Sequence, residues 1–151
     1  MLYQIVLGST LLLSSVVIAA LSFWFMEVGL VRFRGFLAQA PHRPRLILML
    51  CVVSLWILAQ ITAGVWLWAL TFYGLGAFAT VEESLYFAIV TYTTLGFGDV
   101  LLAQDWRILS GMAAANGLLN IGLLTAVLVE ALAQVRRIQT DAIRESARHR
   151  E

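Results

Sequence analysis

The chain has 151 residues, of which 61% are hydrophobic and 13% are charged, and its formal net charge is +1 at pH 7. A single small soluble core would not hide so many apolar side chains, so the composition excludes an ordinary soluble domain and indicates a membrane protein. A transmembrane helix needs roughly 20 mainly apolar residues. Three segments meet this requirement: 2–31, 46–72 and 106–135.

The first segment, 1–31, is predicted to be an additional N-terminal transmembrane helix. No Lys or Arg precedes Arg32, so the segment lacks the positive start of a signal peptide and is expected to be retained. Its hydroxyl side chains favour helix packing, with a helix lying in the membrane interface as the alternative. These residues are Ser9, Thr10, Ser14 and Ser15.

The arginines predict the orientation of the chain. Four of the ten basic residues lie in the basic loop 32–45, and five lie in the charged tail 136–151. The positive-inside rule places both segments in the cytoplasm, which leaves the N-terminus and the acidic segment 73–105 outside. The tail is predicted to be a charged helix with Glu145 and Arg148 spaced for pairing, and contact with anionic lipid is a hypothesis.

Residues 80–99 are predicted to enter the membrane from outside and return. Thr80 and Glu83 form a capping-box pattern, which favours a helix over 81–93. About 13 residues at 1.5 Å each give about 20 Å, which reaches halfway across a bilayer. The chain must then return through non-helical backbone, which survives at that depth only when it is buried in protein or lines a watery path.

The returning stretch, TTLGFGD at 93–99, resembles the signature of potassium channels, and the resemblance extends over 46–135. Gly96 and Gly98 alternate with larger residues. This pattern is expected where left-handed backbone dihedral angles, which glycine adopts readily, alternate with ordinary ones. The resemblance implies an all-α membrane protein with three transmembrane helices, a re-entrant pore helix at 81–93, a filter at 94–99 and an inner helix at 106–135. Because one chain supplies one loop, a C4 homotetramer is expected.

The resemblance also implies how the ion is bound. Backbone carbonyls would replace the hydration shell of K⁺, with the Thr94 hydroxyl at the inner end and the Leu95 side chain turned away into protein. The filter residues are Thr94, Leu95, Gly96, Phe97 and Gly98. No organic cofactor is expected.

The supporting residues depart together from the common family pattern. Phe97 replaces a tyrosine whose hydroxyl is held by a tryptophan at the position of Phe87, so the two rings are expected to pack together. Tyr86 replaces the adjacent tryptophan and is expected to reach Asp99, which is then a brace rather than an ion ligand. Val90 and Thr93 complete the predicted support.

The last span is predicted to line the cavity below the filter. The family register places four residues on one pore-facing stripe: Leu119, Gly122, Ala126 and Glu130. Gly117 and Gly122 suit either a hinge or close helix packing, while Asn116 and Asn120 are expected to bond across helices. Glu130 either forms a ring of four carboxylates that makes conduction sensitive to cytoplasmic pH, or turns sideways towards an arginine such as Arg136 or Arg137, or reaches solvent.

These features predict a potassium-selective channel in the plasma membrane, or cell inner membrane, with membrane lipid and identical subunits as its partners. A weakly selective cation channel, permitted by Leu95, and a non-conducting membrane subunit are the alternatives. Cys51 is a lone cysteine, and His42 and His149 share no ligand spacing. No enzyme motif is present, and no nucleic acid or small-molecule substrate is expected.

Overall fold

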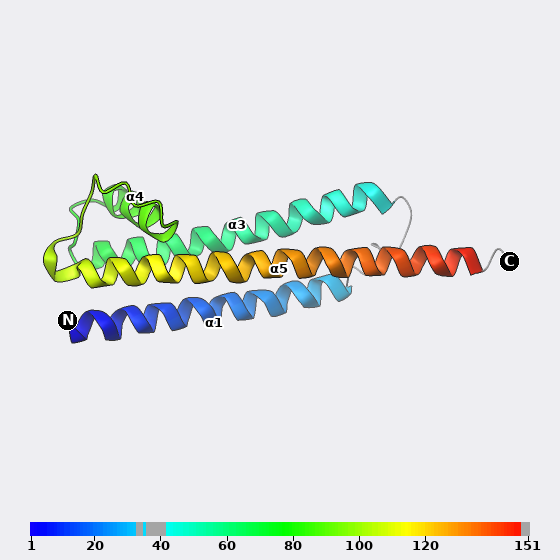
Figure 1. The fold of residues 1–151 in the computed structure, drawn as a ribbon, viewed down its shortest axis with the longest axis horizontal. Coiled ribbons are helices and arrows are strands. Elements are labelled where there is room, and N and C mark those ends of the chain that lie inside the picture. The colour runs from blue at the N-terminus through cyan, green and yellow to red at the C-terminus, as the bar shows by residue number, and fades with distance from the viewer. Residues whose placement is uncertain (33–34, 36–41, 149–151) are drawn as a thin grey trace. The chain divides into compact units, whose positions relative to one another are not determined.

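The computed structural model describes residues 1–32, 35 and 42–148, and within these ranges it contains helices and no strands. The elements are α1 (Leu2–Arg32), α3 (His42–Gly74), α4 (Val81–Tyr92), the 3₁₀ turn η1 (Gln104–Trp106) and α5 (Arg107–Arg148) (Figure 1). Three stretches are long and apolar enough to cross a membrane: Leu2–Gly29, Pro44–Gly74 and Gln104–Asp141. The predicted all-α membrane protein with three transmembrane helices is confirmed.

The last helix continues through the charged tail. α5 runs from Arg107 to Arg148 without a break at residue 135, since no glycine or proline follows Gly122 to interrupt it. The tail therefore prolongs the last span instead of forming a separate helix. Most of the basic loop 32–45 and the side chains of the predicted Glu145–Arg148 pair lie outside the described part of the chain.

The chain divides into two compact units. Unit 1 comprises residues 1–19 and 59–123, and unit 2 comprises residues 20–58 and 124–151. The core of unit 2 contains Val53 of α3 and Val135 of α5. In the same unit, Trp56 Nε1 donates a hydrogen bond to Ser22 Oγ at 2.7 Å, which ties α3 to α1.

Unit 1 is built around aromatic rings. Phe72 of α3 lies with its ring centroid 5.3 Å from Phe87 of α4, and Phe78 lies 5.0 Å from the same ring. Leu109 and Ala113 of α5 join this core. The short helix α4 therefore packs against both α3 and α5. In Figure 1 it lies beside the C-terminal end of α3.

Helix α4 begins and ends close to the predicted residues. Thr80 is its N-cap in extended conformation, and Thr80 Oγ1 accepts a hydrogen bond from the Glu83 backbone N–H at 3.1 Å. Glu82 and Glu83 lie in the first turn, where the helix dipole favours negative charge. The last helical residue is Tyr92, and Thr93 forms the C-cap.

Candidate functional site

The loop after α4 has a backbone that alternates in hand. Thr94, Gly96 and Gly98 have φ angles of 59°, 58° and 77°, whereas the intervening Leu95 and Phe97 have negative φ. Successive carbonyls of such a backbone can point to the same side. Glycine adopts these dihedrals freely, but a left-handed Thr94 costs roughly 1–2 kcal/mol, so the surrounding structure must hold it. The sequence pattern indicated the two glycines and not Thr94.

The end of α4 holds the loop in this conformation. The Val90 carbonyl accepts hydrogen bonds from the backbone N–H groups of Leu95 at 3.0 Å and Gly96 at 3.2 Å. The Thr91 carbonyl accepts from the Thr94 N–H at 2.9 Å, and the Thr93 hydroxyl donates to the Ile89 carbonyl at 2.7 Å. The terminal carbonyls of the helix are thus used to fix the loop. Val90 contributes to this support through its backbone.

Tyr86 and Asp99 form the contact expected from the sequence. Tyr86 Oη donates a hydrogen bond to Asp99 Oδ2 at 2.5 Å, which ties the outer end of the loop to α4. This bond is the main reason that the pKa of Asp99 is lowered and the pKa of Tyr86 is raised. Both side chains are exposed, so Asp99 is an ionised brace at the surface of unit 1.

The predicted packing of Phe87 on Phe97 is wrong within one chain. The Phe87 ring is buried against Phe72 and Phe78, because α3 and residue 78 enclose that face of α4. Phe97 is 65% exposed. Leu95, expected to point into protein, is 57% exposed. The chain itself therefore does not cover either side chain of the loop.

Tyr92, which the sequence interpretation did not single out, is enclosed between two glycines. An added Cβ at Gly64 of α3 would collide with Tyr92 Oη, and one at Gly117 of α5 would collide with the Tyr92 carbonyl. Tyr92 is 1% exposed. Of the two roles left open for Gly117, this contact supports packing. Glycines within apolar helices were the available signal, but the sequence does not show which residue approaches them.

The predicted pore-facing stripe of α5 is open in the single chain. Leu119, Gly122, Ala126 and Glu130 are all exposed, and an added Cβ at Gly122 would meet no heavy atom within 4 Å. Gly117 is buried on another side of the helix. Gly117 therefore does not line the same face of α5 as the four stripe residues, which remain uncovered in the single chain.

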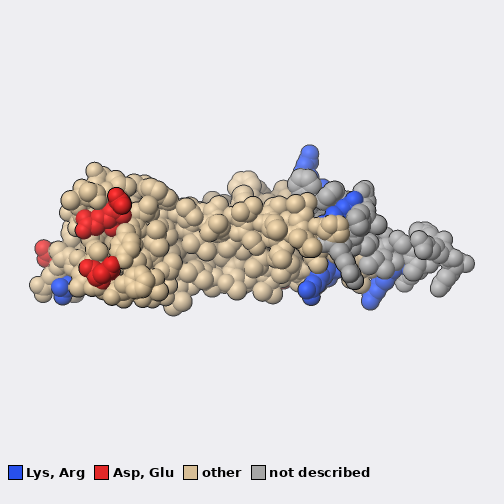
Figure 2. Space-filling model, turned by 90° about the horizontal axis from the view of Figure 1, so that it is seen from above, with Lys and Arg blue, Asp and Glu red and all other residues tan. Residues whose placement is uncertain are grey.

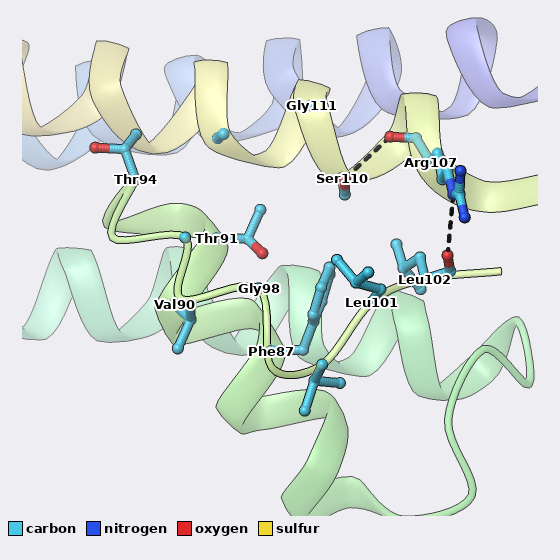
Figure 3. Close-up of a pocket in the computed structure, with 13 residues that line it drawn as sticks. Phe87, Val90, Thr91, Thr94, Gly98, Leu101, Leu102, Arg107, Ser110 and Gly111 are labelled. Atoms are coloured by element: carbon cyan, nitrogen blue, oxygen red, sulfur yellow. Dashed lines mark hydrogen bonds between the residues drawn. The ribbon is translucent and has the colours of Figure 1, made fainter. Parts of the chain in front are cut away.

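A hollow of about 560 Å³ adjoins the loop (Figure 3). Phe87, Val90 and Thr91 of α4 lie on one side of it and Arg107, Ser110 and Gly111 of α5 lie on the other, with Thr94, Gly96 and Gly98 of the loop along its wall. The lining contains no nucleophile paired with a base.

The described side chains do not form a metal site. Within the described ranges, no group of three His, Cys, Asp or Glu side chains is placed to hold a metal ion. Acidic side chains gather on the surface of unit 1 (Figure 2), where Glu82, Glu83, Asp99 and Asp105 are exposed.

Comparison with known proteins assigns more than half of the chain to a family. Residues 47–134, more than half of the chain, match a protein family described as "Ion channel". No curated protein and no solved structure matches the chain. The matched region contains nearly all of α3, the whole of α4 and the loop, and the first part of α5. Helix α1 lies outside it.

Proposed function

We propose, from the premise that this chain belongs to the ion channel family, that it conducts K⁺ passively across a membrane through a filter formed by residues 94–98. The observation that carries this proposal is the alternating hand of the backbone at Thr94, Gly96 and Gly98. The carbonyls of residues 94–97 and the Thr94 hydroxyl replace the hydration shell of the ion. The function is transport and not catalysis.

The proposed assembly is a homotetramer with C4 symmetry. One chain supplies one loop, and a closed ring of four loops surrounds a path on the symmetry axis. The exposure of Leu95 and Phe97 in the single chain supports this arrangement, because neighbouring subunits would cover apolar side chains that the chain leaves open. Membrane lipid surrounds the outer helices.

The proposed orientation follows from charge. The N-terminus and the acidic surface of unit 1 face outwards, where Glu82, Glu83 and Asp99 attract cations to the outer mouth. The arginine-rich segments, including the exposed Arg136 and Arg137, face the cytoplasm. The membrane is the plasma membrane, or cell inner membrane.

Two alternatives differ from this proposal in what crosses the membrane. Leu95 stands where potassium channels usually have valine or isoleucine, and a different branch behind the filter permits looser packing and weaker selectivity. A non-conducting subunit would carry no current. The test is the reversal potential of the purified protein in a planar bilayer with K⁺ on one side and Na⁺ on the other. A reversal potential near zero would support weak selectivity, and absence of current would overturn conduction.

A further inference from the structure

A buried polar cluster joins α1 to α5 within unit 1. Ser15 Oγ of α1 donates to Asn116 Oδ1 at 2.6 Å, and Asn120 Nδ2 donates to the same oxygen at 2.7 Å. Asn120 Nδ2 also lies 3.1 Å from Ser15 Oγ. All three side chains are buried. The asparagines therefore bond across helices, as expected, and their partner belongs to the one long helix that the family match does not cover.

The same cluster reaches the end of the pore helix. The side chain of Asn120 lies close enough to that of Tyr92 to interact with it, and Tyr92 is the last residue of α4. The Tyr92 carbonyl lies against Gly117, the neighbour of Asn116 on α5. Two residues later the chain adopts the left-handed conformation of Thr94. A continuous set of contacts thus connects Ser15 with the start of the filter loop.

Other contacts fix the position of α1 along α5. Gln4 Nε2 donates to the Asp105 backbone carbonyl, and the rings of Tyr3 and Trp106 meet edge to face at 6.2 Å. An added Cβ at Gly8 would collide with the Met112 side chain, so the two helices approach closely there. These contacts involve residues of α1 that precede Ser15 in the chain. They fix how far α1 is shifted along α5, so that the Ser15 hydroxyl lies beside Asn116 and Asn120.

General stabilisation accounts poorly for this cluster. Among the described residues, Asn116 Nδ2 is buried without a hydrogen-bond partner, and an unpaired buried donor costs free energy. Apolar side chains would join two membrane helices without that cost. In the described part of the chain, the neighbouring Ser14 bonds only within its own helix, to the Thr10 carbonyl at 2.8 Å. The Ser15–Asn116–Asn120 hydrogen bonds are therefore better explained as interactions that orient the two asparagine side chains.

We propose that α1 positions the filter, with Ser15 as a positioning residue that orients the Asn116–Asn120 pair and, through this pair and the adjacent Gly117, the Tyr92 end of the pore helix. This inference rests on the proposed function. A displacement of α1 changes the geometry at Thr94, and so the discrimination between K⁺ and Na⁺, although no part of α1 touches the ion.

The test is Ser15→Ala in the purified full-length protein, with Ser14→Ala as the matched control on the same helix. The readout is the K⁺/Na⁺ permeability ratio from the reversal potential, because that ratio does not depend on how many channels are folded. An interhelical hydrogen bond in a membrane is typically worth enough to change an equilibrium about threefold. We expect Ser15→Ala to lower the ratio about threefold and Ser14→Ala to leave it unchanged.

Further variants keep the proposal falsifiable if Ser15→Ala does not fold. Ser15→Thr retains the hydroxyl and should retain the wild-type ratio, whereas Ser15→Cys offers only a weak donor and should lower it. Adding Ser15→Ala to Asn116→Ala should lower the ratio less than Ser15→Ala does in the wild type, because the Ser15–Asn116 bond is already absent and only the longer Ser15–Asn120 contact remains to be lost.

A selective wild type with an unchanged ratio in Ser15→Ala, or in Ser15→Cys, would overturn this inference and leave the proposed function intact. A folded wild type without cation current would overturn the proposed function first, and the inference with it.

Discussion

At the scale of single residues, the backbone and the side chains of the loop 94–98 have different roles. Thr94, Gly96 and Gly98 supply left-handed backbone, and the residues between them carry large apolar side chains that stand exposed in the single chain. The hydrogen bonds to the Val90 and Thr91 carbonyls give the loop its rigid attachment. In the proposed channel, the backbone carbonyls bind the ion, and the side chains of Leu95 and Phe97 contact neighbouring subunits.

Replacing Gly96 or Gly98 with alanine should abolish K⁺ flux. An added Cβ at either position meets no heavy atom within 4 Å in one chain, so the expected loss arises from the positive φ, which costs an alanine roughly 1–2 kcal/mol in each subunit. The measurement is K⁺ uptake into liposomes. Gly29→Ala is the matched control, because it also enters open space but lies in a regular helix. Selective flux through both filter variants would contradict the carbonyl filter.

Tyr86→Phe should make conduction sensitive to external acid at a higher pH than in the wild type. The Tyr86 hydrogen bond lowers the pKa of Asp99 below its ordinary value of 3.8. The bond therefore stabilises the loop fully above that value and is lost only as the pH falls through the lowered pKa. Without the hydroxyl, the largest cause that lowers the pKa of Asp99 is gone, while burial still raises this pKa and the backbone N–H groups of Asp99 and Val100 still lower it, so protonation begins at a higher pH.

The measurement for Tyr86→Phe is current against external pH, with Tyr73→Phe as a control at the end of α3. The raised pKa of Tyr86 keeps its hydroxyl protonated up to and beyond its ordinary value of 10.0, so the bond persists across the neutral range. Identical acid responses in wild type and Tyr86→Phe would show that Asp99 does not brace the conducting loop.

At the scale of elements, the end of α4 depends on two glycines in neighbouring helices. Gly64 and Gly117 leave the space that Tyr92 fills, so α3 and α5 determine where the pore helix ends and the loop begins. The position of the loop therefore depends on how Tyr92 packs against Gly64 and Gly117.

Gly117→Ala should destabilise the protein by about 1–3 kcal/mol, the usual cost of overpacking a core, because its Cβ would collide with the Tyr92 backbone, which cannot move away as a flexible side chain can. Thermal unfolding of the purified protein in detergent measures the effect. Gly122→Ala, five residues further along α5 and facing open space, should be neutral or slightly stabilising. Equal stabilities of the two variants would refute the packing role.

The helices and the loop were predictable from local patterns. Segment hydropathy predicted the three long helices, Thr80 and Glu83 predicted the start of α4, and Gly96 and Gly98 predicted the unusual backbone. The Tyr86–Asp99 bond was also expected.

What could not be predicted depends on contacts between segments that are distant in sequence. The enclosure of Tyr92 by Gly64, the bond from Ser15 to Asn116 and the burial of Phe87 away from Phe97 follow from helix packing, which periodicity does not reveal. Local patterns determine where helices begin and end, but they do not determine which faces meet.

At the scale of the whole molecule, the proposed channel forms only when several chains assemble. A single loop surrounds nothing, and the stripe containing Leu119, Gly122, Ala126 and Glu130 is open in the single chain. A symmetric ring of four chains gives both features a common axis. Glu130 would then contribute four carboxylates near the cytoplasmic mouth.

Glu130→Gln should lower single-channel conductance about twofold or more at low ionic strength, because a ring of negative charge concentrates cations at the entrance. The difference should disappear in concentrated salt, which screens the ring. Glu27→Gln, which removes an exposed carboxylate from α1, is the control. Unchanged conductance in Glu130→Gln at low salt would indicate that the side chain turns away from the axis.

Crystals of the protein grown in Rb⁺, a K⁺ substitute whose anomalous scattering locates it, would show whether the backbone carbonyls of residues 94–97 bind a dehydrated potassium ion. We expect a column of anomalous peaks on a fourfold axis, between the carbonyl oxygens of Thr94, Leu95, Gly96 and Phe97. Four loops around that axis without peaks, or an assembly in which the loops share no axis, would contradict this mode of binding.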